Sequence, residues 1–366
     1  MRLGYNKAES RDAALLERAA RFRDRPEGAS LREARMLVGL GPGDVLDGRF
    51  LVVEMLNQGG MAVIFKALDL KNGDREVAVK LPHMGLESNP ASYARFAREE
   101  EIGLQLDHPF VMKFIGVNGS RTRPYIVAEY LRGETLADVL GKIRPLPEKD
   151  ALKFASLICE ALEYLHGHAI VHRDLKPSNV MVCADGSIRV MDFGISYTEA
   201  ARRVTFCGFS TAMGTADYVA PEQIRGRRGD QRTDIYSLGA MLYEMLTGKA
   251  PFDGDDPFII MNRRMSGDPA APRKLNPSLS PQAEEIVLRA LQRDPSGRYP
   301  SAAAMKADLD APEKMRLTGL CERLTESTRW RRFLLLARWL TLTCVIPLAV
   351  QVILFFLLWH HFARKR

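Results

Sequence analysis

A short stretch of the chain combines residue types that suit phosphoryl transfer. It reads H-R-D-L-K-P-S-N from His172 to Asn179, and D-F-G follows thirteen positions later. Asp174 is a candidate base for a hydroxyl proton, and Lys176 is a cation that can face a phosphoryl group. Asn179 and Asp192 carry oxygen atoms of the kind that bind Mg2+. Together these groups indicate transfer of a phosphoryl group from ATP.

At these residues the chain resembles the eukaryotic-like, Hanks-type bacterial serine/threonine protein kinases, and the resemblance runs from about Asp47 to Ala311. It implies an α+β, bilobal fold with a small antiparallel β-sheet N-lobe, one main helix in that lobe, and a mostly helical C-lobe. It also implies that ATP and Mg2+ are the cofactors and that Ser and Thr hydroxyls of protein substrates accept the γ-phosphoryl group. Lys176 is typical of serine/threonine rather than tyrosine kinases.

A lysine at the end of an expected strand is the second part of the resemblance. Residues 77–80 read V-A-V-K and alternate like a strand. By resemblance Lys80 holds the α- and β-phosphates, and Glu99 is its partner. Glu100 and Glu101 are alternatives, because successive helix residues are turned about 100° apart and only one of them can face the cleft. The expected catalytic residues are Asp174, Lys176, Lys80 and Glu99.

The phosphate-covering loop departs from the family pattern G-x-G-x-x-G. Only the middle glycine, Gly59, is kept, while Asn57 and Ala62 replace the other two. Glycine suits this loop because backbone N–H groups must approach phosphate closely. We therefore expect weaker nucleotide binding rather than its loss. The residues expected to bind the cofactor are Leu56, Asn57, Gly59, Gly60, Val63, Ala78, Lys80, Ala128, Glu129, Asn179 and Asp192, with Asn179 and Asp192 as the metal ligands.

The strand before the hinge between the lobes carries an unusually small residue. Ala128 precedes Glu129-Tyr130, where the family normally has a bulkier side chain. We expect this alanine to leave the pocket behind adenine open, unless a neighbouring side chain fills the space.

Regulation is expected in the segment from Asp192 to Glu222. By resemblance Thr211 is the favoured site of the activating phosphate, Ser210 is second and Thr205 is a further candidate. Arg173 would pair with that phosphate. Autophosphorylation is the expected means of activation, with self-association allowing one copy to phosphorylate another.

Two further patterns are expected to build the C-lobe. Residues 180–190 read as a hairpin, which would bring both metal ligands to one end. Residues 234–239, D-I-Y-S-L-G, match the family's central C-lobe helix. Arg298 is the expected partner of Glu222, and we expect this pair to be structural because a buried charge needs its opposite.

Two other kinds of function remain as alternatives. A membrane-anchored pseudokinase would bind nucleotide or a partner without transferring phosphate, and the missing glycines favour it. The intact Lys80, Asp174, Asn179 and Asp192 oppose it. A small-molecule kinase is the third possibility, which the complete segment from Gly214 to Glu222 makes less favoured than a protein kinase.

A long apolar run follows the kinase-like region. Residues 339–359 form twenty-one positions without a charge, which would span about 31 Å as a helix, the thickness of a bilayer core. Tryptophans at both ends fit the aromatic belt. Because ATP is cytosolic, we expect a single-pass anchor in the inner (cytoplasmic) membrane, with the kinase domain in the cytosol. Pro347 leaves a shallow hairpin open, and a buried core helix is the other alternative.

The expected organisation combines these patterns. Ser30 and Glu33 form a capping box that would open a helix before the first lobe. The expected parts are an N-terminal helical extension (1–42), the kinase N-lobe (43–131), the C-lobe (132–311), a basic juxtamembrane segment (312–338), the transmembrane helix (339–359) and a short C-terminal stub (360–366).

Composition excludes some classes of function. The chain has 52 Lys and Arg against 45 Asp and Glu, and its excess positive charge is concentrated near the termini. Nucleic acid is therefore not an expected partner. The five cysteines show no C-x-x-C pair, which suits a reducing compartment and no zinc site. Residues 1–35 contain charges throughout, so we expect no secretory signal peptide.

Overall fold

The computed structural model describes residues 17–23, 28–87, 89–192, 216–252, 254 and 256–322, with four isolated positions between 339 and 351. The predicted phosphorylation sites Thr205, Ser210 and Thr211 lie outside the described residues, as does nearly all of the predicted span 339–359. In the described part of the chain, no helix has the length and hydrophobicity needed to cross a membrane.

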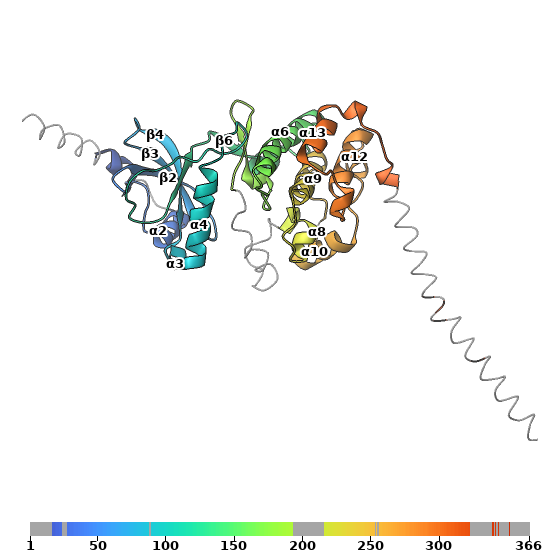
Figure 1. Ribbon diagram of the computed structural model, residues 1–366, viewed down its shortest axis with the longest axis horizontal. Helices are drawn as coiled ribbons and strands as arrows, with labels where there is room; N and C mark the ends of the chain where they lie inside the picture. Colours follow the sequence, from blue (N-terminus) through green and yellow to red (C-terminus); the bar gives the residue numbers. More distant parts are fainter. Residues whose placement is uncertain are drawn as a thin grey trace, which may run out of the picture.

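Two lobes make up the described part, a smaller lobe built on a sheet with flanking helices and a larger helical lobe (Figure 1). The predicted α+β bilobal fold with an antiparallel N-lobe sheet is therefore confirmed. The five strands of this sheet lie in the order β1-β2-β3-β4-β5, and every neighbouring pair is antiparallel. The strands are β1 (Val45–Leu46), β2 (Phe50–Gln58), β3 (Ala62–Asp69), β4 (Arg75–Pro82) and β5 (Ile126–Glu129).

Strand β4 shows how the sheet faces the site. Val77, Val79 and Leu81 are at most 1% exposed and pack in the N-lobe core. Because successive side chains of a strand point to opposite faces, Ala78 and Lys80 lie on the other face of the sheet. This face is the one that meets the C-lobe.

The N-lobe also contains helices α2 (Ala29–Val38), α3 (Met84–Glu87) and α4 (Pro90–Gly103), and residues 17–23 are helical as well. Helix α2 buries Ala34 and Val38 against the sheet core. The predicted capping box at Ser30 is wrong. The helix already begins at Ala29, and its N-cap is Gly28, which provides no side-chain hydrogen bond. Ser30 lies inside the first turn, whereas a capping side chain must come from the extended residue before it.

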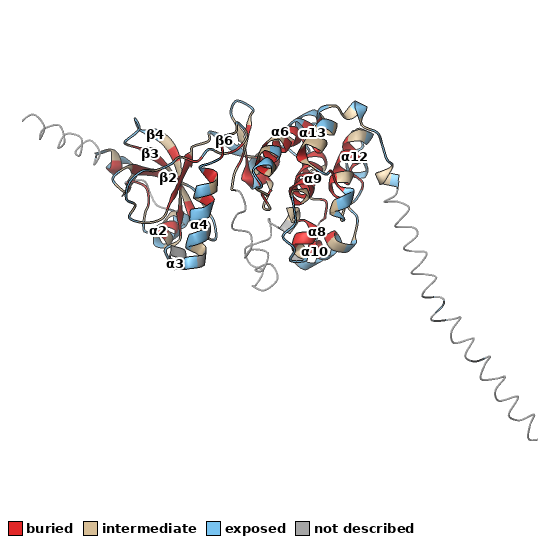
Figure 2. Ribbon diagram, viewed as in Figure 1, coloured by how far each residue is buried: buried red, intermediate tan, exposed pale blue. Residues whose placement is uncertain are grey.

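The C-lobe is built around one buried helix. From Thr233 to Leu246, α9 (Arg232–Thr247) is buried along its whole length (Figure 2). It packs against α6 (Glu148–Gly167) and α12 (Pro281–Ala290). The other helices are α5 (Leu136–Lys142), α8 (Pro221–Ile224), α10 (Pro257–Ser266), α11 (Pro272–Leu275) and α13 (Ala302–Asp310), with short 3-10 turns η1 (Pro177–Asn179), η2 (Ala216–Tyr218), η3 (Pro295–Gly297) and η4 (Pro312–Lys314).

A small antiparallel sheet lies between the lobes, in the order β6-β7-β8. Its strands are β6 (Gly133–Thr135), β7 (Val180–Cys183) and β8 (Ile188–Val190). The predicted hairpin over 180–190 is confirmed, with Val180 opposite Val190 and Gly186 at a φ of 78° in its turn. Asn179 and Asp192 therefore flank the same end of the hairpin.

Candidate active site

The buried carboxylate of Asp234, on α9, holds the backbone of the H-R-D-L-K stretch. The backbone N–H groups of His172 and Arg173 each donate to one of its oxygens, at 2.8 Å. Arg173 adopts a φ of 62°, a left-handed conformation that is costly for a residue with a side chain. Two charge-assisted hydrogen bonds to a buried carboxylate stabilise this conformation. The central helix thus sets the position of Asp174, the next residue.

His172 connects the same loop to the second metal-ligand candidate. Its ring is buried, its Nδ1 accepts from the backbone N–H of Asp174 at 3.3 Å, and its Nε2 lies 3.0 Å from the carbonyl oxygen of Met191. Because Nδ1 is the acceptor, Nε2 carries the proton and donates to that carbonyl. His172 therefore fixes the loop relative to Asp192, which follows Met191.

Asp174, Lys176 and Asn179 form one polar cluster. Lys176 Nζ lies 2.9 Å from Asp174 Oδ2. The Asn179 amide donates to the Asp174 carbonyl oxygen at 2.8 Å and to its Oδ2 at 3.2 Å. Since an amide is planar, the Asn179 side-chain oxygen points away from Asp174. The cluster thus offers a carboxylate acceptor, a cation and an amide oxygen within one loop.

Lys80, Glu99 and Asp192 form a second cluster across the lobes. Lys80 Nζ lies 2.6 Å from Glu99 Oε1 and 3.1 Å from Asp192 Oδ1. Burial opposes the charge on Lys80, but the carboxylates of Asp192 and Glu99 outweigh it and raise the pKa of the ammonium. The charge of Lys80 holds the pKa of Asp192 below its ordinary value. Burial raises the pKa of the Glu99 carboxyl, and the charge of Lys80 opposes that shift. The pKa shifts of Lys80 and Asp192 both favour their charged forms.

The neighbours of Glu99 have different positions, as the helical repeat requires. Glu100 makes two hydrogen bonds to the guanidinium of Arg121, at 2.6 and 2.9 Å. Glu101 is exposed. Of the three consecutive glutamates, Glu99 is the one that the structure places beside Lys80.

Asn179 and Asp192 are the residues that could hold a metal. They flank the β7–β8 hairpin, and the Met191 N–H donates to the Asn179 carbonyl at 2.9 Å. Within the described ranges, no cluster of three or more His, Cys, Asp or Glu suits a metal ion. Mg2+ is commonly held by one or two protein oxygens together with phosphates and waters. The amide and carboxylate oxygens present here fit that ion.

The β2–β3 turn explains how the altered glycine pattern is accommodated. The Gly59 N–H donates to the Ala62 carbonyl at 2.9 Å and closes the turn. Neither Asn57 nor Ala62 has a positive φ, so neither position needs the conformational freedom of glycine. At Gly60 an added Cβ would meet nothing within 4 Å. The two substitutions therefore leave the backbone of the turn unstrained.

The prediction that Val63 faces the nucleotide is corrected by the strand register. Val63 lies opposite Leu81 and is fully buried in the N-lobe core. Ile64 lies opposite Lys80, and Asn57 lies opposite Ile64, so these three residues share one face of the sheet. Alternation along the strand thus excludes Val63 from the cleft and places Ile64 there.

The remaining residues expected at the nucleotide lie near the end of β2, in the turn that follows it, and on β4 and β5. Ala78 lies opposite Ala128, and Ala128 is 5% exposed. The Glu129 carboxylate accepts from the Lys113 N–H at 2.9 Å. Leu56, before the turn, is 41% exposed. Ala78 and Ala128 thus lie on the same face of the N-lobe sheet as Lys80, which follows Ala78 by two residues on β4.

Phe114 was not identified from the sequence. It lies opposite Ala128, and a Cβ added to Gly103 of α4 would meet its ring at 2.2 Å. The ring therefore packs between the hinge strand and the helix that carries Glu99. A lone phenylalanine in an irregular segment gives no signal of this contact in the sequence.

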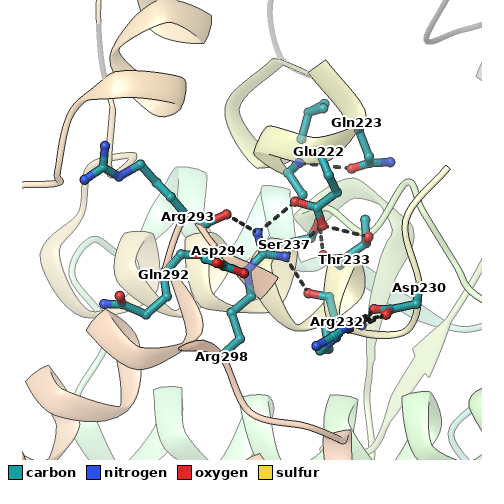
Figure 3. A network of polar contacts seen from close by, with 12 residues as sticks. Glu222, Gln223, Asp230, Arg232, Thr233, Ser237, Gln292, Arg293, Asp294 and Arg298 are labelled. Atoms are coloured by element: carbon teal, nitrogen blue, oxygen red, sulfur yellow. Dashed lines mark hydrogen bonds and ion pairs between the residues drawn. The ribbon is translucent and has the colours of Figure 1, made fainter. Parts of the chain in front are cut away.

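The expected pair of Arg298 and Glu222 is a bidentate ion pair, with both N···O distances 2.8 Å (Figure 3). The side chains are 0% and 9% exposed. Thr233 donates a further hydrogen bond to Glu222 at 2.8 Å. Gln223, the next residue, donates to the Arg173 carbonyl at 2.9 Å. The end of the segment 192–222 is thereby joined to the loop that carries Asp174.

Arg264 of α10 is another residue that sequence reasoning missed. It is fully buried and donates to the carbonyl oxygens of Asp217 at 2.6 Å and Val219 at 3.0 Å. It holds the backbone of the stretch that leads into α8. A single arginine in an amphipathic helix resembles an exposed residue, so only the tertiary contacts identify its role.

Comparison with known proteins agrees with this geometry. The model of the protein kinase domain family matches residues 50–309. Serine/threonine-protein kinase PknB of Mycolicibacterium smegmatis is 38% identical over 268 residues, which cover 72% of this chain and 43% of that protein. Serine/threonine-protein kinase PrkC of Bacillus subtilis is 34% identical over 267 residues, 73% of this chain and 41% of that protein. The chain thus matches less than half of the length of these relatives.

A solved structure shows the same fold. The crystal structure of Rad53 residues 1–466 in complex with AMP-PNP superposes with a TM-score of 0.58 at 28% sequence identity. The match covers 70% of this chain and 64% of that chain.

Proposed function

We propose that this chain, which belongs to the protein kinase domain family, is a protein serine/threonine kinase. It transfers the γ-phosphoryl group of ATP to protein hydroxyls. One observation carries the proposal. Lys80 is held by Glu99, and its Nζ lies 3.1 Å from Asp192 Oδ1. This contact joins the candidate phosphate-binding lysine of the N-lobe to a candidate metal ligand that follows the β7–β8 hairpin. A loose phosphoryl-transfer transition state requires this arrangement of fixed charges.

Each charged group has a role in that reaction. Asp174 accepts a hydrogen bond from the acceptor hydroxyl and takes its proton. Lys176, 2.9 Å from Asp174, offsets charge on the transferred group. Lys80 binds the phosphates of ATP and is kept in place by Glu99. Asn179 and Asp192 would hold a bound Mg2+, which would supply positive charge to the phosphate oxygens.

Specificity for protein Ser and Thr hydroxyls is supported by the relatives. The names of both bacterial relatives describe serine/threonine-protein kinases. Lys176 agrees with that class.

A pseudokinase is the alternative, and the altered glycine pattern at Asn57 and Ala62 is what favours it. The charged clusters oppose it, since a nucleotide-binding scaffold needs neither the Asp174 carboxylate nor its contact with Lys176. Labelled ATP and Mg2+ should be incubated with the purified chain and a generic protein acceptor, beside an Asp174→Asn variant. Transfer by the wild type alone supports a kinase. Equal ATP binding by both proteins without any transfer would leave the pseudokinase.

Activation by autophosphorylation is part of the proposal. Thr211 is the first candidate for the activating phosphate, followed by Ser210 and Thr205, and Arg173 is the candidate partner of that phosphate. Transfer between copies predicts that the initial rate of autophosphorylation rises with the square of the protein concentration. A rate that is first order in protein would indicate transfer within one chain.

Membrane anchoring through residues 339–359 completes the proposal, with the kinase domain in the cytosol at the cytoplasmic membrane. Its support is the uncharged run of twenty-one residues. The full chain should stay in the membrane fraction after alkaline carbonate washing, whereas a chain ending at residue 332 should not. Release of the full chain by carbonate would rule out the anchor.

A further inference from the structure

A basic loop, defined as residues 225–231 between α8 and α9, exposes three arginines. Arg225, Arg227 and Arg228 are all exposed, and none of them pairs with a carboxylate among the described residues. The acidic residue of the loop, Asp230, is engaged by Arg232, with Nη2 and Oδ2 2.6 Å apart. The loop therefore presents net positive charge to its surroundings.

The backbone of the basic loop is held in one conformation. Gly226 and Gly229 have φ angles of 72° and 67°, which side chains rarely adopt. A Cβ at Gly229 would also lie 2.1 Å from Thr233 Oγ1. The Arg227 N–H donates to the Glu222 carbonyl at 3.0 Å, and the Glu222 carboxylate is fixed by Arg298 (Figure 3). A ligand of the three arginines thus does not have to order the backbone that carries them.

The basic loop is also attached to the residue that precedes Asp174. Arg173 Nε donates to the Arg228 carbonyl at 3.2 Å, and the Gln223 side chain donates to the Arg173 carbonyl at 2.9 Å. Burial and the nearby charge of Arg228 lower the pKa of the Arg173 guanidinium. Positive charge therefore gathers beside the position where the acceptor hydroxyl must lie.

We propose that Arg225, Arg227 and Arg228 bind acidic side chains of the protein acceptor. An extended polypeptide advances about 3.3 Å per residue, so Asp or Glu a few residues from the phosphorylated hydroxyl comes within reach of the loop. Arg matches carboxylate geometry and forms charge-assisted hydrogen bonds. This inference rests on the proposed kinase function and assigns it a class of substrate.

The test compares two acceptor peptides with the full chain as enzyme. The peptides share one Ser or Thr and differ only in the residues that flank it on both sides, which are Asp and Glu in the acidic peptide and Asn and Gln in the neutral one. The variant Arg225→Ser/Arg227→Ser/Arg228→Ser removes the basic loop's charge. The control Lys71→Ser/Arg75→Ser/Lys153→Ser removes the same charge from exposed positions outside the basic loop.

For the wild type and the control, we expect kcat/KM to be at least tenfold higher for the acidic peptide at low salt, and the preference to shrink as salt screens the charges. The loop variant should lose the preference while its kcat/KM for the neutral peptide stays within twofold. A preference that survives in the variant would overturn the proposal. An equal fall in kcat/KM for both peptides would also overturn it, because the arginines would then affect the enzyme itself rather than the acidic peptide.

A failure of the kinase function would look different. If the wild type binds ATP but phosphorylates neither peptide, the proposed function fails and the substrate class fails with it. If the wild type phosphorylates both peptides equally, the chain is a kinase and only the acidic-acceptor proposal is overturned.

Discussion

Glu99 Oε1 lies 2.6 Å from Lys80 Nζ and so joins helix α4 to strand β4. The Glu99 side chain is 5% exposed and that of Lys80 is 23% exposed, so the pair is only partly screened by water. Without Glu99, Asp192 would be the acidic group of this cluster that remains beside the Lys80 ammonium. The ammonium would then pair with Asp192 and compete with a metal ion for that carboxylate. The pair therefore keeps Lys80 available for phosphate.

Replacing Glu99 with Gln should lower kcat/KM by at least about tenfold, which corresponds to about 1.4 kcal/mol of transition-state stabilisation. The loss of the negative charge leaves Lys80 free to pair with Asp192. Steady-state kinetics with a peptide acceptor would measure the effect. Glu101→Gln is the matched control, because this glutamate is exposed on the same helix, and its kcat/KM should stay within twofold. Similar losses in both variants would contradict the assignment of Glu99.

Gly103→Ala should weaken both stability and activity. The added methyl would lie 2.2 Å from the Phe114 ring, and such overpacking costs about 1–3 kcal/mol. Because Gly103 ends the helix that carries Glu99, we also expect a lower kcat. Urea unfolding and kinetics should show partial recovery in the double variant Gly103→Ala/Phe114→Leu.

The control for that prediction is Gly141→Ala in α5. An added Cβ there meets nothing within 4 Å, so the substitution should be neutral or slightly stabilising. Additive effects of the Gly103 and Phe114 substitutions would show that the two residues do not interact.

Arg298→Met should be strongly destabilising. Removing one partner of a buried ion pair leaves Glu222 uncompensated, at a cost of about 3–5 kcal/mol. Denaturant unfolding would measure the loss. Lys142→Ala removes an exposed pair with Glu134 and should cost at most about 1 kcal/mol. Equal effects of the two substitutions would show that the buried pair is not a main contributor to stability.

Contacts between residues that are close in the sequence were predicted better than contacts between residues that only the fold brings together. Asp174, Lys176 and Asn179 lie within one loop, so their spacing alone indicated their cluster. Val63 was misplaced because the phase of β3 decides which residues face the cleft, and Ile64 rather than Val63 lies opposite Lys80. Local sequence does not specify that phase.

Contacts between distant segments could not be predicted from the sequence. Phe114 reaches Gly103 across an irregular segment, and Arg264 reaches backbone carbonyls of another element. Backbone carbonyls are present at every residue, so no sequence pattern marks the ones that a buried arginine will contact. The start of α2 at Ala29 likewise has no local signal, because its N-cap Gly28 provides no side-chain hydrogen bond.

Asp69→Asn should change how stability depends on pH. Hydrogen bonds from Arg49 outweigh the burial of Asp69 and hold the pKa of its carboxyl below the ordinary value of 3.8. The unfolded chain therefore binds more protons in acid than the native protein does. The stabilisation is complete above the unfolded pKa and is lost as the pH falls through the lower native pKa.

Urea unfolding of the wild type and the Asp69→Asn variant would measure this difference. The stability advantage of the wild type should shrink between about pH 5 and pH 3. An advantage that is constant over this range would contradict a lowered native pKa for Asp69.

Mass spectrometry of the full chain after incubation with ATP and Mg2+ is the most direct measurement of the central claim, that this chain transfers phosphate to Ser and Thr hydroxyls. We predict phosphate on Ser or Thr of the wild type, including Thr211 or Ser210, and none on an Asp174→Asn variant that binds ATP equally well. An unmodified wild-type chain that nevertheless binds ATP would contradict the claim.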